Sequence, residues 1–171
     1  MGSGGADGIA KVVRQQESWA SLYSAVVITH CEPWCLVPNQ TLKVRTARRT
    51  QLLDVTAQVQ QAVEKSRVTS GVCYVYVPHT TAAIMINECA DPDVASDLEG
   101  AFDRLIPFEG PYRHVEGNSD SHMKSLLVGA SQTIFVEDGK LRLGRWQGIF
   151  FCEFDGPRDR HLQVKVIPEQ L

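Results

Sequence analysis

The chain has 171 residues, of which 43% are hydrophobic and 22% are charged, and these values suit one globular domain with a full core. The formal net charge of −3 does not favour general nucleic-acid binding, which is typical of basic chains. No apolar run reaches the length of a membrane span, and the first residues lack the pattern of a secretory signal. We therefore expect a cytoplasmic protein that binds neither nucleic acid nor membrane.

Residues 1–37 are expected to form an N-terminal extension, partly flexible, before a main domain at 38–171. Within the extension, 26–28 are rich in β-branched residues and predict a short strand. Residues 30–35, HCEPWC, contain an imidazole and two thiols but lack a second half with zinc-site spacing. Local packing of thiols is therefore preferred there over a metal site. The odd total of five cysteines favours reduced thiols.

From position 40 the pattern becomes clearer. Alternation of apolar and polar residues predicts a strand over 41–46, and Asp54 is placed to cap a helix over 55–66. A run of β-branched and aromatic residues predicts a strand over 72–77, which Pro78 ends because proline has no N–H to donate. A second short strand is predicted over 83–86.

The sequence Asp91-Pro92-Asp93 indicates a helix start, and an apolar stripe follows it until Pro107, formed by Val94, Leu98, Phe102 and Leu105. A polar loop over 108–119 precedes a short helix over 120–128, with His122 and Lys124 on its polar side. A hairpin over 133–143 and two strands over 146–154 and 161–167 complete the chain. Strands and helices followed by a run of strands predict an α+β fold with a largely antiparallel sheet.

Three of the five histidines, His79, His114 and His122, occupy unusual settings. His79 follows the end of a predicted strand, His114 lies in a glycine-containing polar loop, and His122 opens a helix. Neutral imidazole is a good ligand for Zn, Mn, Fe or Ni, so a metal or catalytic cluster is one interpretation. Three separate, hydrogen-bonded histidines are the alternative that the spacing leaves open.

Other polar residues extend this hypothesis. The helix start at Ser121 and the ammonium of Lys124 suit an anion, because orphan N–H groups point outward there. Glu88 is a better candidate for binding chemistry than Asp91 or Asp93, whose place in a first helical turn already explains them. Trp146 is interpreted either as a stacking platform or as an ordinary buried residue. The cysteines in strands are expected to be buried and inert.

Several long segments together resemble the secondary thiamine-phosphate synthase family, also called the YjbQ-like family. They are 79–94 (HTTAAIMINECADPDV), 112–118 (YRHVEGN), 122–131 (HMKSLLVGAS), 143–149 (LGRWQGI) and 153–158 (EFDGPR). The resemblance spans about 40–167. Arg145 stands where the family usually has Thr, and Ser121 stands where it usually has Ala.

The resemblance implies an α+β homotrimer with sites near subunit contacts. It also implies a metal or anion site at the three histidines. The implied reaction forms thiamine phosphate from two small phosphorylated substrates, a pyrimidine diphosphate and a thiazole phosphate. We expect a divalent metal, Zn, Mn or Mg. The site residues we assign are Glu88 and Lys124 as catalytic, Asn118, Ser121, Trp146 and Gln147 as substrate-binding, and His79, His114 and His122 as metal ligands. A metal- or ligand-binding homotrimer without catalysis and a metal-dependent phosphate-ester hydrolase are the alternative functions.

Overall fold

The structure is a computed structural model that describes residues 38–169. The predictions for 26–28 and 30–35 lie outside these residues. The described elements are, in chain order, β1 (Gln40–Arg45), β2 (Gln51–Asp54), α2 (Thr56–Ser66), β3 (Ser70–Tyr76), β4 (Ala82–Glu88), α3 (Pro92–Leu105), α4 (Ser119–Val128), β5 (Ser131–Glu137), β6 (Lys140–Leu141), β7 (Gln147–Glu153) and β8 (Asp159–Pro168).

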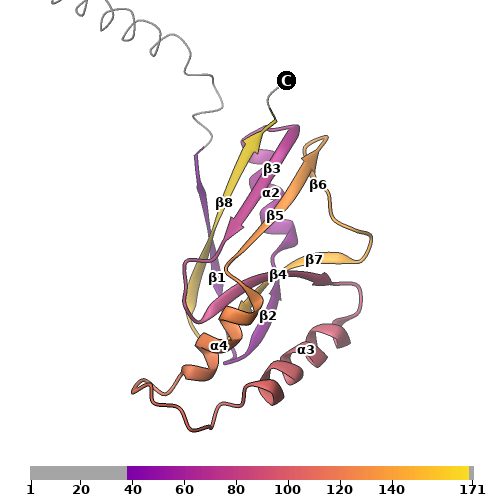
Figure 1. Ribbon diagram of the computed structural model, residues 1–171. Coiled ribbons are helices and arrows are strands. Elements are labelled where there is room, and N and C mark those ends of the chain that lie inside the picture. The colour runs from indigo at the N-terminus through magenta and orange to yellow at the C-terminus, as the bar shows by residue number, and fades with distance from the viewer. Residues whose placement is uncertain (1–37, 170–171) are drawn as a thin grey trace, which may run out of the picture. The chain divides into compact units, whose positions relative to one another are not determined.

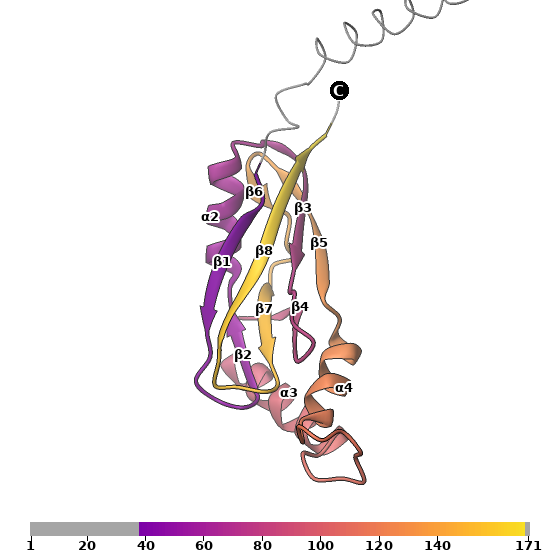
Figure 2. The ribbon, with the colours of Figure 1, turned by 90° about the vertical axis from the view of Figure 1, so that its left-hand side faces the viewer.

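The strands form two sheets. One has five strands in the order β1-β8-β3-β5-β6, and the other has three in the order β2-β7-β4. The pairings within both sheets are antiparallel, which confirms the predicted α+β fold. Helix α2 lies against one face of the larger sheet, and among residues 38–169 no helix covers β8, β3 and β5 on the opposite face (Figures 1 and 2).

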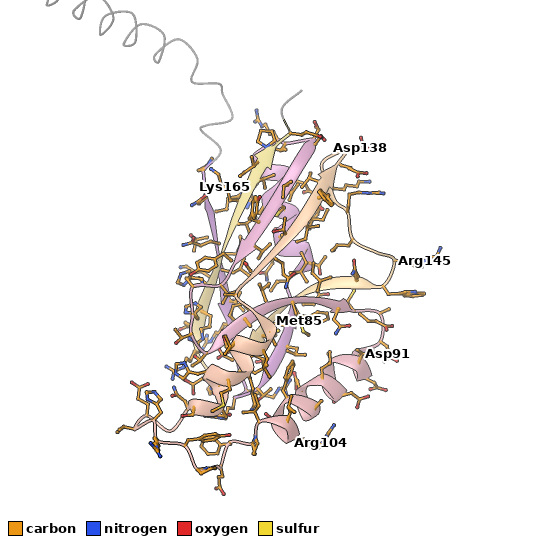
Figure 3. All side chains as sticks on the ribbon, in the orientation of Figure 1. Met85, Asp91, Arg104, Asp138, Arg145 and Lys165 are labelled. Atoms are coloured by element: carbon orange, nitrogen blue, oxygen red, sulfur yellow. The ribbon has the colours of Figure 1, made fainter. Side chains whose placement is uncertain are left out.

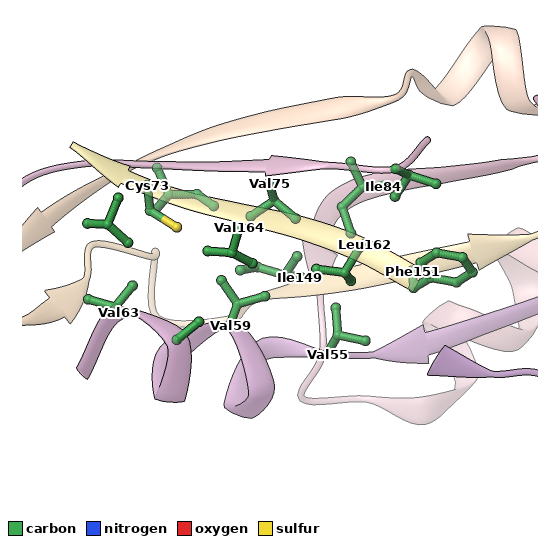
Figure 4. Close-up of a cluster of buried hydrophobic side chains, with 14 of the residues drawn as sticks. Val55, Val59, Val63, Cys73, Val75, Ile84, Ile149, Phe151, Leu162 and Val164 are labelled. Carbon is green, nitrogen blue, oxygen red and sulfur yellow. The ribbon is translucent and has the colours of Figure 1, made fainter. Parts of the chain in front are cut away.

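The main core lies between α2 and the inner faces of the strands (Figure 4). Val59 and Val63 recur at helical spacing on α2, and both are fully buried. Strand β3 alternates, so Cys73 and Val75 face this core while Tyr74 on the same strand is exposed. Burial of this apolar surface is the main force that holds the helix on the sheet.

Helix α3 begins as predicted, because the Asp91 side chain accepts a hydrogen bond from the Asp93 N–H at 2.9 Å. Phe102 packs on a second core cluster that includes Phe154. The predicted apolar stripe is wrong at its end, since Leu105 is 69% exposed. It lies in the last turn of the helix, beyond the layer against which Phe102 packs.

The turns match their sequence signals. Gly129 ends α4 with a φ of 98°, and the β5–β6 hairpin turns at Asp138 and Gly139, which both have positive φ. The turn between β7 and β8 contains a cis bond before Pro157. Within residues 38–169, no helix combines the length and the apolar character that crossing a membrane requires.

Candidate functional site

The segment between α3 and α4 brings two of the predicted metal ligands together. Pro107 follows the end of α3, and the chain then loops through 107–118 before α4 starts at Ser119. The ring centroids of His114 and His122 are 5.4 Å apart, with the rings nearly perpendicular. A shallow cavity of about 340 Å³ lies between His114, Ser119, His122 and Met123.

These two imidazoles are accessible to solvent and to ligands. The His114 side chain is 44% exposed, and its Nε2 lies 3.7 Å from Oε2 of Glu116. A nearby carboxylate stabilises a charged imidazole or orients a neutral one. The pair can thus offer ring nitrogens to a cation or hydrogen bonds to an anion.

The start of α4 is held from inside the protein. The Asn118 amide donates to Oδ2 of Asp155 at 3.0 Å, and the Ser121 hydroxyl donates to the Phe154 carbonyl at 2.5 Å. Both side chains are buried, so these predicted substrate-binding residues serve first to anchor the helix on the β7–β8 turn. Asn118 Oδ1 is buried without a hydrogen-bond partner in the described part of the chain.

Lys124 lies on the polar side of α4, as predicted, and that side is buried. Its side chain is 1% exposed, and its Nζ donates to Oδ1 of Asp103 at 2.7 Å and to Oδ2 of Asp120 at 3.0 Å. Partial burial acts to raise the pKa of Asp103, but hydrogen bonds from Lys124 and Thr50 outweigh it and hold that pKa below its usual value. The ammonium is therefore committed to two carboxylates and is not free to bind phosphate as a point charge.

Helix α4 is consequently inverted relative to an ordinary amphipathic helix. Its buried residues are polar, namely Asp120, Ser121, Lys124 and Ser125. Its exposed residues include Leu126 at 81% and Leu127 at 61%. The polar side that carries Lys124 is thus turned inward, and an ion-pair network with Arg49 and Asp103 satisfies the buried charges.

Glu88, Trp146 and Gln147 lie together, but apart from the histidine pair. Glu88 and Gln147 are register partners at one end of the β4–β7 pair. The other end of β4 meets α4, where the Ser125 hydroxyl donates to the Ala82 carbonyl. Glu88 lies six positions along the extended strand from Ala82, a distance of roughly 20 Å.

Figure 3 shows this separation: Arg145 and Asp91 lie on the side of the molecule opposite α4. Trp146 is 59% exposed and is not buried, so stacking on a ligand is open to it. The Gln147 Oε1 accepts from the Gly144 N–H at 2.8 Å, which fixes the loop before β7.

His79 lies apart from both groups, against β8. Its ring contacts that of His161 edge-on, with centroids 4.7 Å apart. Its Nε2 lies 3.1 Å from the His161 carbonyl and 3.2 Å from the His161 N–H. Strand β3 pairs with β8 only from Gln163 onward. At His161, the His79 ring therefore contacts the backbone groups that a paired strand would otherwise contact. Burial, with Arg160 and His161 nearby, lowers the pKa of His79.

The structure also contains charged residues that sequence reasoning missed. Arg160 donates to both carboxylate oxygens of Glu153, at 2.7 and 2.8 Å, and Glu153 is fully buried. Arg49 pairs with Asp120 and lies over the Phe108 ring, 4.1 Å from its centroid. The available signal was the recurrence of Glu, Asp and Arg around the turn at 153–160.

The two strand cysteines are buried, as predicted. Burial raises the pKa of the Cys73 thiol to about 12 and also raises that of Cys152. Both thiols are therefore inert at neutral pH. Cys89 is exposed.

Comparison with known proteins agrees with this architecture. Residues 40–169 match the family model described as "UPF0047 protein YjbQ-like". The chain belongs to the YjbQ-like family. It is 50% identical to UPF0047 protein YugU of Bacillus subtilis over 129 residues, which cover 75% of this chain and 98% of that one. It is 40% identical to a UPF0047 protein of Methanothermobacter thermautotrophicus over 138 residues, which cover 80% and 96%.

Solved structures give the same result. A YjbQ/UPF0047-family crystal structure from Clostridium acetobutylicum superposes with a TM-score of 0.74 at 51% identity, covering 75% of this chain and 99% of that chain. A hypothetical protein from Aeropyrum pernix gives a TM-score of 0.74 at 38% identity, covering 77% and 99%. The names of these relatives state no activity, and the family is described as uncharacterised.

A metal at this site would have an incomplete set of ligands from one chain. No group of three or more His, Cys, Asp or Glu side chains within residues 38–169 is arranged to hold an ion. The predicted convergence of His79 with His114 and His122 is thus not seen within the described chain. The His114–His122 pair could offer two ring nitrogens, and further ligands would have to come from outside this pair.

Proposed function

We propose that the cavity at the start of α4 binds a divalent metal together with a phosphorylated small molecule, and that the reaction there forms thiamine phosphate. The observation that carries the proposal is the approach of His114 and His122 on either side of an open cavity. The resemblance of residues 79–158 to the synthase family supports the reaction chosen.

The residues of this chain would act as binding and orienting groups. His114 and His122 would hold the metal through ring nitrogens, and Glu116 would orient His114. The Asn118 Oδ1 is buried and unpartnered in the described residues, and a small shift at the helix start would let it accept a hydrogen bond from a ligand. A bound divalent metal neutralises phosphate charge and stabilises a leaving diphosphate.

In the proposed reaction the thiazole nitrogen attacks the methylene carbon of the pyrimidine diphosphate, and the bond from that carbon to the diphosphate oxygen breaks. Negative charge grows on the leaving group, so donors and cations must surround it. Lys124 is already paired with Asp103 and Asp120, and we therefore assign it to positioning α4 and not to this charge.

The test is steady-state formation of thiamine phosphate by untagged protein, with both substrates and added Mg²⁺ or Mn²⁺. We expect a kcat on the order of 1 s⁻¹, as for ordinary enzymes. The double variant His114→Ala/His122→Ala should lose this rate, while Lys140→Gln on the exposed β5–β6 hairpin serves as a matched control. A rate orders of magnitude lower in the unaltered protein contradicts the synthase assignment.

The commitment of Lys124 favours a second candidate function, metal and ligand binding without turnover. Synthase chemistry needs a cation near the diphosphate, and the lysine nearest in sequence to His122 is occupied. Tight metal binding without product would support this candidate. Release of inorganic phosphate from simple esters would instead indicate a hydrolase.

We also propose that the protein is a homotrimer. Two different apolar surfaces are exposed on one chain: the outer face of α4, with Leu126 and Leu127, and the uncovered face of the larger sheet, with Tyr74, Tyr76 and Phe135. Unlike surfaces that meet head to tail generate a closed ring when the rotation between copies closes. Such a ring would also let a second copy complete the set of metal ligands.

A further inference from the structure

A second cavity lies on strands β1 and β8, at the edge of the larger sheet, where the two strands run side by side (Figure 2). Its volume is about 640 Å³, within the range of small-molecule sites. Its lining includes Thr41, Lys43, Arg45, Asp159 and His161. It shares no lining residue with the cavity at His114 and His122.

Strand geometry gathers these side chains on one face. Thr41, Lys43 and Arg45 alternate along β1, and alternate residues of a strand point to the same side. The register places Lys43 directly opposite His161 and Arg45 directly opposite Asp159. Opposed side chains in an antiparallel pair lie within reach of one ligand group.

Most of the positive charge in this cavity is uncommitted. Lys43 forms no ion pair with any residue in the described range 38–169. Arg45 lies 3.9 Å from Asp159, but both side chains are 89% exposed, so water screens that pair. The contrast is Arg160, whose side chain is 9% exposed and whose charge is matched by Glu153.

The contact with His79 fixes the position of the His161 ring. His79 packs edge-on against the His161 ring, and its Nε2 also lies close to the backbone carbonyl and N–H of His161. Among the described residues, the cavity lining therefore offers one held imidazole, one ammonium, two guanidinium groups and the Thr41 hydroxyl, against the one carboxylate of Asp159. Of the two guanidinium groups, only that of Arg45 is free of a buried carboxylate partner. Such a set of donors matches the oxygens of a phosphate group.

We infer that this cavity binds the phosphate group of a small molecule, with Lys43 and Arg45 as its cations and His161 and Thr41 as further donors. Asp159 opposes binding and limits affinity. This site goes beyond the proposed function, because it requires neither a metal nor the histidine pair.

The test is calorimetric titration with inorganic pyrophosphate, in EDTA and at fixed ionic strength, so that no metal contributes. Lys43→Gln should weaken binding about tenfold, the equivalent of one charge-assisted hydrogen bond. Asp159→Asn should tighten binding several-fold, because it removes the one carboxylate that lines the cavity among residues 38–169. Both positions are exposed, and thermal unfolding of each variant checks that the fold is kept.

Two controls separate this site from others. Lys140→Gln removes an exposed lysine on the β5–β6 hairpin and should leave binding unchanged. His114→Ala/His122→Ala should also leave it unchanged, whatever that variant does to metal binding or turnover. The inference is overturned if unaltered protein fails to bind pyrophosphate at millimolar concentration, if Lys140→Gln weakens binding as much as Lys43→Gln, or if Asp159→Asn does not tighten it.

Discussion

Replacing the buried lysine of α4 tests the inverted helix directly. The variant Lys124→Met keeps the length and apolar stem of the side chain but removes the charge. It leaves Asp120, which is fully buried, without its partner at 3.0 Å, although Arg49 still lies 2.9 Å away. Removing one member of a buried ion pair typically costs about 3–5 kcal/mol, and the remaining arginine places this case near 3 kcal/mol.

The loss corresponds to a fall in melting temperature of roughly 6–12 °C for a domain of this size. Urea unfolding followed by circular dichroism measures the free energy of unfolding, with Lys140→Met as the exposed control. If Lys124→Met costs less than about 1 kcal/mol, the lysine is not a structural ion-pair partner. A free phosphate-binding lysine would show the reverse pattern, with ligand affinity lost and stability kept.

Three further predictions concern other groups. The pKa of His79 is lowered in the folded protein, so the unfolded chain binds more protons in the pH range between the folded pKa and the ordinary value of about 6.5. The free energy of unfolding should therefore fall as the pH decreases from about 6.5. His79→Gln should remove this part of the pH dependence in urea titrations, and parallel curves would contradict the reasoning. With a thiol pKa of about 12, Cys73 should resist iodoacetamide at pH 8 until the protein unfolds, while exposed Cys89 reacts at once, as peptide mass spectrometry can show. Leu126→Glu should reduce the mass of the assembly in light scattering while Leu105→Glu on α3 does not, and an unchanged trimer in both would exclude the α4 surface as the contact.

The strands were predictable because their chemistry is local. Alternation along β1 and β3 and the Asp138-Gly139 turn are visible in any window of a few residues. Each element predicted within residues 38–169 appears within a few residues of its place. The cap at Asp91 was equally local. Strand β4 is longer than predicted and extends to Glu88, because β7 pairs with its full length.

The site was less predictable, because its residues meet through tertiary structure. Helical periodicity shows two faces of α4, but it does not say which is buried when carboxylates elsewhere neutralise the lysine. The spacing of Asp120 and Lys124, four residues apart, was the one signal of an ion pair. The partner of His79 could not be read from the sequence either, since His161 lies 82 positions away.

The central claim is that His114 and His122 jointly hold a divalent metal. Calorimetric titration with Mn²⁺ tests it most directly, because Mn²⁺ prefers nitrogen and oxygen ligands and so avoids the thiols of the chain. We predict that the unaltered protein binds Mn²⁺ and that His114→Ala and His122→Ala each weaken this binding at least about a hundredfold. Even residues that only hydrogen-bond to a metal ligand contribute up to that factor to affinity. His161→Ala, the matched histidine control outside the cavity, should bind as the unaltered protein does. Equal Mn²⁺ affinity in all four proteins, or no binding in any, would contradict the claim.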